Sequence, residues 1–223
     1  MLFTASVIEL SDDHRISNGT VRVVYEFPGQ PDLLIKVFHS FDDRSSKRPI
    51  KRLAWTLFPT LRFRSILNEL QCELLVSLKL GSDIKSMPIS RMLGIVQTNR
   101  GPGVVVERIN GLGGGLAPRL HQLSGGKTMA EPVLDALNVM VKKMFELQIV
   151  ARDINLSNIV YGSRDAGAAC FLIDGYGERN VVPLRSMSKR LNDRSLDRQF
   201  ASIAQKNTSL AWDSDHRIFL NSH

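Results

Sequence analysis

The chain has 223 residues, of which 43% are hydrophobic, and a formal net charge of +7. This length allows one sizeable core or two small lobes that share a cleft, and the composition excludes a disordered or fibrous protein. No apolar run approaches the roughly 20 residues that a membrane helix needs. Residues 1–10 carry no basic segment and reach Glu9 quickly, so we predict no signal peptide and a cytoplasmic location.

Two cysteines, Cys72 and Cys170, are the only ones in the sequence. One falls in a helical pattern and the other in a strand pattern, so we expect both to be small core residues of a reduced protein. Without a CxxC motif, a structural zinc site is not expected.

Basic residues gather in two stretches, at 44–64 and at 179–198. Such a charge permits contact with a nucleotide, a nucleic acid or an anionic membrane surface, and a solvated basic face explains it equally well. Aromatic residues make up only 7% of the chain and do not alternate with the basic ones, which argues against single-strand binding by base stacking. The second stretch is the candidate for contact with a membrane or an anionic substrate.

The first half of the sequence predicts strands and one long helix. Strands are expected at 21–27 and 33–38, around a turn with two prolines. A helix is expected at 62–80, because apolar residues recur there at spacings of three and four. The predicted buried stripe of this helix is Ile66, Leu67, Leu70, Leu74 and Leu78.

Two more strands, at 92–96 and 104–109, are expected to form a hairpin, and the glycine-rich stretch 111–126 reads as a linker. A second amphipathic helix is predicted at 131–147, with Pro132 in its first turn. Its apolar stripe is Val133, Leu137, Met140, Val141 and Met144.

Short strands at 159–161 and 170–173 follow the second helix, and the tail from Arg185 is predicted to be helical. The order of elements predicts an α+β fold with two lobes inside one domain. The antiparallel β lobe would span about 1–109 and a reduced helical lobe about 116–223, with the boundary near 110–115.

The strongest chemical signal is the segment 152–158, RDINLSN. It has an Asp and, five residues later, an Asn, placed between a helix and a short strand. A carboxylate at Asp153 can orient an attacking hydroxyl and take its proton. The carboxamide oxygen of Asn158 can bind Mg²⁺ without adding negative charge beside phosphates, while its NH₂ group bonds back to the loop.

A second carboxylate, Asp174, follows the strand 170–173 and precedes Gly175. If the strands 159–161 and 170–173 form a hairpin, Asn158 and Asp174 come to the same end of it. Such a pair makes a two-ligand magnesium site whose other positions water and phosphate can fill.

Lys36 lies inside the apolar strand LLIKV. A lysine in such a place usually has a partner for its ammonium group. Glu69 and Glu73 lie one turn apart on the helix 62–80, and either could supply it; Glu69 is preferred. The paired lysine would then hold phosphate oxygens.

These segments occur in the order of the protein-kinase signature: LLIKV, the NEL of the helix, VVVERI, RDINLSN and LIDG. More closely, residues 17–177 resemble the bacterial YrbL-type PhoP regulatory network proteins. The resemblance implies a catalytic base at Asp153, metal ligands at Asn158 and Asp174, and a phosphate lysine at Lys36 paired with Glu69. Glu107 and Ile109 would offer backbone groups to adenine.

The sequence also departs from the kinase pattern. Ala151 stands where many kinases have His, and Asn155 where protein kinases carry Lys. The glycine-rich loop is thin, with only Gly19. An APE-type motif is missing and the C-terminal part is short, so a peptide in the usual groove is not expected as the substrate.

Three hypotheses remain from the sequence. The first is a phosphotransferase that uses ATP and Mg²⁺ to phosphorylate an unidentified hydroxyl acceptor, in a PhoP-linked stress or envelope response. The second is a pseudokinase that regulates a partner, favoured by the missing His, Lys and glycines. The third and weakest is a basic nucleic-acid binder, whose affinity would fall steeply with salt.

Overall fold

The computed structural model describes residues 7–18, 22–38, 60–124, 128–165, 167–178 and 184–222. The predicted glycine loop at Gly19 and most of the basic stretch 44–64 therefore lie outside the described residues. The chain divides into two compact units, one of Met1–Arg64 with Arg91–Arg108 and one of Ser65–Ser90 with Ile109–His223. Each unit is described by itself.

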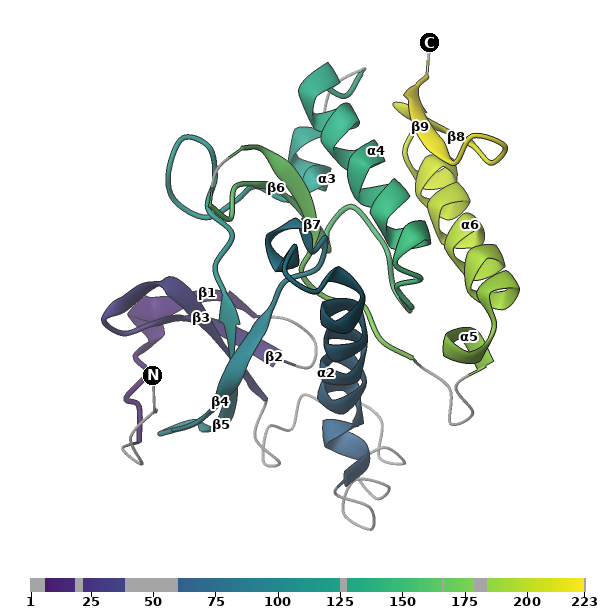
Figure 1. The fold of residues 1–223 in the computed structure, drawn as a ribbon. Coiled ribbons are helices and arrows are strands. Elements are labelled where there is room, and N and C mark those ends of the chain that lie inside the picture. Colours follow the sequence, from purple (N-terminus) through teal and green to yellow (C-terminus); the bar gives the residue numbers. More distant parts are fainter. Residues whose placement is uncertain are drawn as a thin grey trace, which may run out of the picture. The chain divides into compact units, whose positions relative to one another are not determined.

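The first unit is built on a five-stranded antiparallel sheet, in the order β1-β2-β3-β5-β4 (Figure 1). Its strands are β1 (Arg15–Asn18), β2 (Arg22–Phe27), β3 (Gln30–Phe38), β4 (Met92–Thr98) and β5 (Gly101–Glu107). The predicted strands are confirmed, although β3 begins at Gln30, before the expected start at residue 33. Gly29, at φ +73°, allows the tight turn that lets Phe27 pair with Gln30.

One face of this sheet carries an apolar core. Its buried members are Leu10, Tyr25, Ile35, Val37, Val96 and Val105. Ile35 and Val37 alternate with Lys36, so the lysine points to the other face of β3, opposite Val24 on β2 and Val104 on β5.

The second unit combines helices with two short hairpins (Figure 1). Its elements are α2 (Thr60–Leu80, which enters this unit at Ser65), η2 (Ile84–Ser86), α3 (Leu120–Leu123), α4 (Glu131–Glu146), β6 (Ile159–Gly162), β7 (Ala169–Leu172), α5 (Leu184–Met187), α6 (Lys189–Lys206), β8 (Leu210–Asp213) and β9 (Ile218–Asn221). The chain is thus a mixed α+β protein with antiparallel sheets, as predicted.

The larger of the apolar clusters described in this unit joins α2, α4, β6, β7, α6 and the β8–β9 hairpin, and a smaller one contains Ile109, Ala117, Val160 and Phe171. Helix α4 packs on β7 and on β9. Its predicted stripe is confirmed, since Val133, Leu137, Met140, Val141 and Met144 are all buried. Among the described residues, no helix is long and apolar enough to cross a bilayer.

Helix α2 forms where it was predicted, but it buries a different face. Four of the five residues of the predicted stripe are exposed: Leu67, Leu70, Leu74 and Leu78. The buried face instead carries Ile66, Glu69, Cys72, Glu73 and Val76. The predicted stripe was therefore right at Ile66 and wrong at the four leucines. The prediction counted apolar residues only and did not consider that a carboxylate with a partner can be buried.

The tail is helical only to Lys206, and the β8–β9 hairpin after it was not predicted. Trp212 on β8 and Phe219 on β9 pack against Phe200 of α6, with ring centroids 5.1 and 5.8 Å from that of Phe200. Strands of four residues are too short to show a clear alternation in the sequence, so this hairpin is held by packing that only the fold supplies.

The glycine-rich link is ordered over residues 111–124. Ala117 donates its N–H to the Ile109 carbonyl at 3.0 Å, and Gly111 donates to Gly115 at 3.0 Å, so the link folds into a closed turn. Gly114 and Gly115 have φ of +89° and +71°, which explains the glycines. The link is therefore more structured here than the linker that was predicted.

Candidate functional site

The β6–β7 hairpin brings Asn158 and Asp174 to one end. Asn158 immediately precedes β6 and Asp174 lies two residues after β7. Ile159 pairs with Leu172, and the Ile173 N–H donates to the Asn158 carbonyl at 2.9 Å. The two predicted ligands therefore lie on adjacent strand ends of a rigid hairpin in the second unit.

The loop 152–158 is fastened to the segment that follows Asp174. The backbone N–H groups of Arg152 and Asp153 both donate to the Gly175 carbonyl, at 2.7 and 3.1 Å. Gly175 has φ +82°, and a Cβ built on it would lie 2.5 Å from the Asp153 carbonyl oxygen. A side chain at position 175 would therefore displace the backbone of Asp153.

Three side chains of the loop form a local hydrogen-bond network. Asn155 Nδ2 donates to Asp153 Oδ1 at 2.9 Å, and Asn155 Oδ1 accepts from the N–H groups of Ser157 and Asn158. Asn158 Nδ2 donates to the Asp153 carbonyl at 3.0 Å. Among the described residues no donor reaches the Asn158 carboxamide oxygen, so it is available to a cation.

Arg152 links the loop to helix α2. Its Nη2 donates to Glu69 Oε1 and to Ser65 Oγ, each at 2.5 Å, and lies 4.0 Å from Asp174 Oδ1. Glu69 is only 2% exposed, so this guanidinium compensates a carboxylate that would otherwise be costly to bury. Sequence reasoning missed Arg152 as a partner of Glu69.

Gly177 explains how closely α2 approaches this loop. A Cβ on Gly177 would lie 2.6 Å from the Asn68 carbonyl oxygen and 3.0 Å from the Glu69 nitrogen, and φ is +91°. The Gly177 N–H donates to the Val150 carbonyl at 2.7 Å. The two glycines of the IDGYG segment thus allow two different close contacts, Gly175 with the loop and Gly177 with α2.

Two residues from the C-terminal part support the loop, and sequence reasoning missed both. Gln199 of α6 donates to the Ala151 carbonyl at 3.0 Å and accepts from the Ile154 N–H at 3.0 Å. Arg185 of α5 also donates to the Ala151 carbonyl, at 2.9 Å, while it holds Glu178 through Nε and Nη2. These side chains hold the backbone of Ala151 and Ile154, and no local pattern in the sequence marks them.

Tyr176 is fully buried beneath the loop, where its hydroxyl donates to the Ser90 carbonyl at 2.8 Å. Burial is the main reason that the pKa of this hydroxyl lies well above its ordinary value, and the neighbouring Glu69 and Glu73 raise it further. The phenol therefore stays neutral and acts as a packing and hydrogen-bonding group.

The remaining predicted residues are divided between the units. Lys36 and Glu107 belong to the first unit, where the Glu107 carboxylate accepts from the Arg91 N–H and Nε, both at 2.9 Å. Ile109 begins the second stretch of the other unit, and its carbonyl accepts from Ala117. The pairing of Lys36 with Glu69 or with Glu73, and the adenine contacts of Glu107 and Ile109, stay predictions.

The site thus presents two carboxylates and a carboxamide, all hard oxygen groups of the kind that Mg²⁺ prefers. Within the described part of the chain, no group of three His, Cys, Asp or Glu side chains gathers as metal ligands. A magnesium site with one Asp, one Asn and phosphate or water oxygens is of a different kind, and the donor atoms present fit it.

Comparison with curated proteins gave no match. A family model described as PhoP regulatory network protein YrbL matches residues 8–208, which is most of the chain and includes every residue of the loop and of the β6–β7 hairpin. The chain therefore belongs to the YrbL family of PhoP regulatory network proteins.

Proposed function

We propose that the two units are the reduced lobes of a protein-kinase-like fold, and that the protein transfers the γ-phosphoryl group of ATP to a hydroxyl acceptor. The observation that carries the proposal is the set of backbone hydrogen bonds that holds Asp153, Asn158 and Asp174 at one end of the hairpin. A loop that holds its acid and amide side chains in place before the substrate arrives is what phosphoryl transfer requires of a protein.

In this proposal Asp153 takes the proton of the acceptor hydroxyl, whose oxygen attacks the γ-phosphorus. The bond from that phosphorus to the β-phosphate oxygen breaks, and ADP leaves. Asn158 and Asp174 would hold Mg²⁺, which neutralises phosphate charge when it is bound. Lys36 joins the proposal through its place in an apolar strand and through the resemblance, as a phosphate contact. Glu107 and Ile109 join it through the resemblance alone, as adenine contacts.

Metal-nucleotide binding is tested by thermal melting with ATP and Mg²⁺ together. Ligand binding to the folded state raises the melting temperature. We expect the rise to vanish in Asp174→Ala and to persist in Asp165→Ala, a control at the opposite end of the same hairpin whose carboxylate pairs with Lys85 at the surface. An equal rise in wild type and Asp174→Ala would contradict the magnesium site.

Transfer itself is tested by following radiolabel from γ-labelled ATP into acceptor or chain. Asp153→Asn should lower the rate by about 10²–10⁴-fold, because the carboxamide cannot accept the proton. The melting response to ATP and Mg²⁺ should remain in this variant. Transfer at the wild-type rate would remove Asp153 from the base role.

One observation favours the alternative, a nucleotide-binding pseudokinase that regulates a partner. Asn155 takes the place of the usual lysine, and its carboxamide is used within the loop, on Asp153 and on two backbone N–H groups. It therefore brings no cation to a phosphate. A melting response to ATP and Mg²⁺ without any radiolabel transfer in the wild type would select this alternative.

A further inference from the structure

A cavity of the helical unit lies apart from the loop 152–158 and Asp174. Its volume is about 270 Å³, and it is lined by α4, the segment of η2 that continues to Pro88, β7, and the turn between β6 and β7. None of the predicted site residues lines it. The cavity is therefore a different place from the site proposed above.

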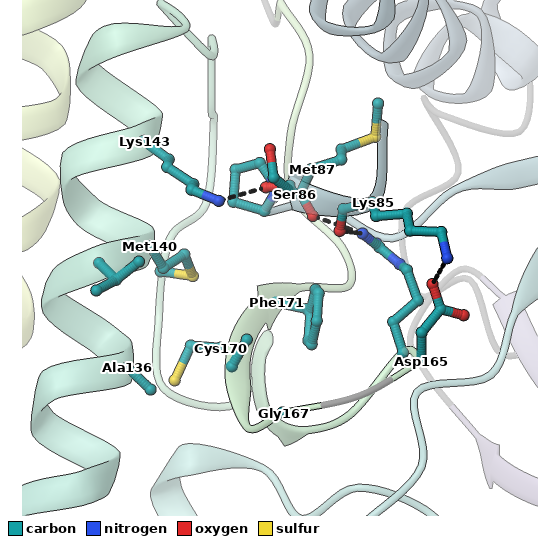
Figure 2. A pocket seen from close by; sticks show the side chains of 14 residues that line it. Lys85, Ser86, Met87, Ala136, Met140, Lys143, Asp165, Gly167, Cys170 and Phe171 are labelled. Atoms are coloured by element: carbon teal, nitrogen blue, oxygen red, sulfur yellow. Dashed lines mark hydrogen bonds and ion pairs between the residues drawn. The ribbon is translucent and has the colours of Figure 1, made fainter. Parts of the chain in front are cut away.

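The floor of the cavity is apolar. Figure 2 shows Cys170 of β7 facing Ala136 and Met140 of α4. Phe171, the next residue of β7, lies on the other face of the strand. Burial raises the pKa of the Cys170 thiol to about 12, so this group stays an uncharged part of the wall. The floor therefore suits the apolar body of a ligand and not its polar head.

The polar end of the cavity is cationic. Lys143 reaches from α4 to the Ser86 carbonyl, with 3.0 Å between Nζ and the oxygen (Figure 2). An ammonium group has three donors, and among the described residues no carboxylate lies within ion-pair distance of this one. Lys143 is therefore placed to bind an anion that enters the cavity.

Two further cations line the same cavity as Lys143. Arg164 is fixed by bonds to the carbonyls of Lys85, Met87 and Ile89, and its guanidinium stacks 4.7 Å from the Phe171 centroid. Lys85 pairs with Asp165 at 3.2 Å, but both side chains are more than half exposed, and such pairs are weak. The residues that line the cavity thus include three cations and the carboxylate of Asp165, beside an apolar floor.

We infer that this cavity binds a small amphiphilic anion, with its carboxylate or phosphate head on Lys143 and a short apolar chain between α4 and β7. The volume has room for on the order of nine water-sized groups, which fits a chain of medium length and no larger cofactor. Charge at one end and apolar side chains at the other are the two properties that select such a ligand.

The test uses sodium octanoate and the full chain, followed by NMR of the methionine methyl groups. A saturable shift of the Met140 methyl is expected, while Met187, which is 75% exposed and lines another part of the surface, serves as the reference. Octanol, which lacks the charge, should bind about tenfold more weakly, because it forms no charge-assisted hydrogen bond with Lys143.

Matched variants separate the cavity from general surface charge. Lys143→Gln should weaken octanoate binding about tenfold and leave octanol unchanged, while Lys143→Arg retains the affinity. Lys142→Gln, one residue earlier on α4, should have no effect, since its ammonium lies 3.8 Å from Glu146 and lines a different pocket.

Octyl phosphate is titrated in parallel, and the tighter of the two anions identifies the head group. Equal affinity for octanoate and octanol, or an unchanged octanoate affinity in Lys143→Gln, would overturn the inference. So would a shift of Met187 in place of Met140, or no saturable shift with either anion. None of these readouts depends on ATP, so the result stands apart from the outcome of the proposed phosphoryl transfer.

Discussion

At the scale of single residues, the segments 152–158 and 174–177 are fixed by contacts within the fold before any ligand is considered. Gly175 accepts two backbone hydrogen bonds, Asn155 orients Asp153, and Gln199 holds the backbone on both sides of the loop's first residues. Fixing the loop by these contacts costs conformational entropy. Because of them, Asp153 and Asn158 are held in one orientation.

Gly175 provides a test at this scale. Gly175→Ala should destabilise the protein by about 1–3 kcal/mol, because it adds both a left-handed backbone strain and a clash with the Asp153 carbonyl. Gly167→Ala is the matched control, since Gly167 has φ +83° and no heavy atom within 4 Å of the added Cβ. Urea denaturation measures both variants.

The control should cost only the backbone strain, about 1 kcal/mol. The difference between the two variants then reports the packing of Gly175 against Asp153. Equal losses would mean that the carbonyl of Asp153 moves aside freely and that the loop is not fastened as described.

At the scale of elements, α2 shows that the spacing of apolar residues can predict the wrong buried face of a helix. Its buried face carries Glu69 and Glu73 beside Ile66, Cys72 and Val76, while four leucines face outward. The Arg152 guanidinium, the Ser65 hydroxyl and the Val150 carbonyl, which accepts from Cys72 Sγ at 3.7 Å, satisfy polar groups on the buried face.

A pair of truncations on α2 distinguishes the two faces. Val76→Ala should lower the free energy of unfolding by about 2 kcal/mol, because Val76 is only 2% exposed and its loss leaves a cavity. Leu78→Ala, at a position 80% exposed, should change it by less than about 0.5 kcal/mol. Chemical denaturation measures the free energy of unfolding of both variants. A larger loss in Leu78→Ala than in Val76→Ala would mean that the face predicted from the sequence is the buried one.

Asp213 stabilises the turn of the β8–β9 hairpin. This carboxylate accepts from the N–H groups of Asp215 and His216 at 2.9 and 3.1 Å, and His216 Nδ1 lies 2.7 Å from Asp213 Oδ2. The backbone bond from His216 is the largest cause that lowers the pKa of Asp213 below 3.8, and the side-chain bond to Asp213 raises the pKa of His216 above 6.5.

These two shifts define a pH window for the turn. Because the pKa of His216 is raised in the folded state, the charged ring stabilises the fold fully below pH 6.5. This stabilisation is lost as the pH rises through the pKa of the folded state. Because the pKa of Asp213 is lowered in the folded state, the charged carboxylate stabilises the fold above pH 3.8. This stabilisation is lost as the pH falls through the pKa of the folded state. The hairpin should therefore be most stable between these two values.

An NMR titration of the His216 ring measures this directly. We expect a pKa above 6.5 in the wild type and a return toward 6.5 in Asp213→Asn, with a smaller decrease in Asp215→Asn, whose charge is the weakest of the causes. If Asp213→Asn leaves the titration of His216 unchanged, the ion pair is not formed in solution.

At the scale of the whole molecule, the larger core of the helical unit contains Ile154 of the loop and Met140 and Cys170, which line the pocket of Figure 2. Cys72 of α2 and Cys170 of β7 both belong to that core, far apart in the sequence. The two free thiols confirm the predicted role of the cysteines as buried core residues. Burial raises their pKa values to about 11 and about 12.

The two thiols report whether this core unfolds as a unit. In the native protein near pH 8, neither should react with Ellman's reagent, since both are buried and protonated. Across a urea series, both should become reactive at one common midpoint. Labelling of Cys72 at a lower urea concentration than Cys170 would show that α2 detaches before the rest of the core.

Local spacing in the sequence determined the two helices 62–80 and 131–147, the β6–β7 hairpin, and the position of Asn158 and Asp174 at the same end of that hairpin. Each depends on residues that are close together along the chain. Only the tertiary structure decided which face α2 buries, that Arg152 binds Glu69 from 83 residues away, and that Gln199 supports the loop from 48 residues away. The physical reason is that a buried charge is stable only beside its partner, and a periodic pattern of side chains records burial without recording the partner.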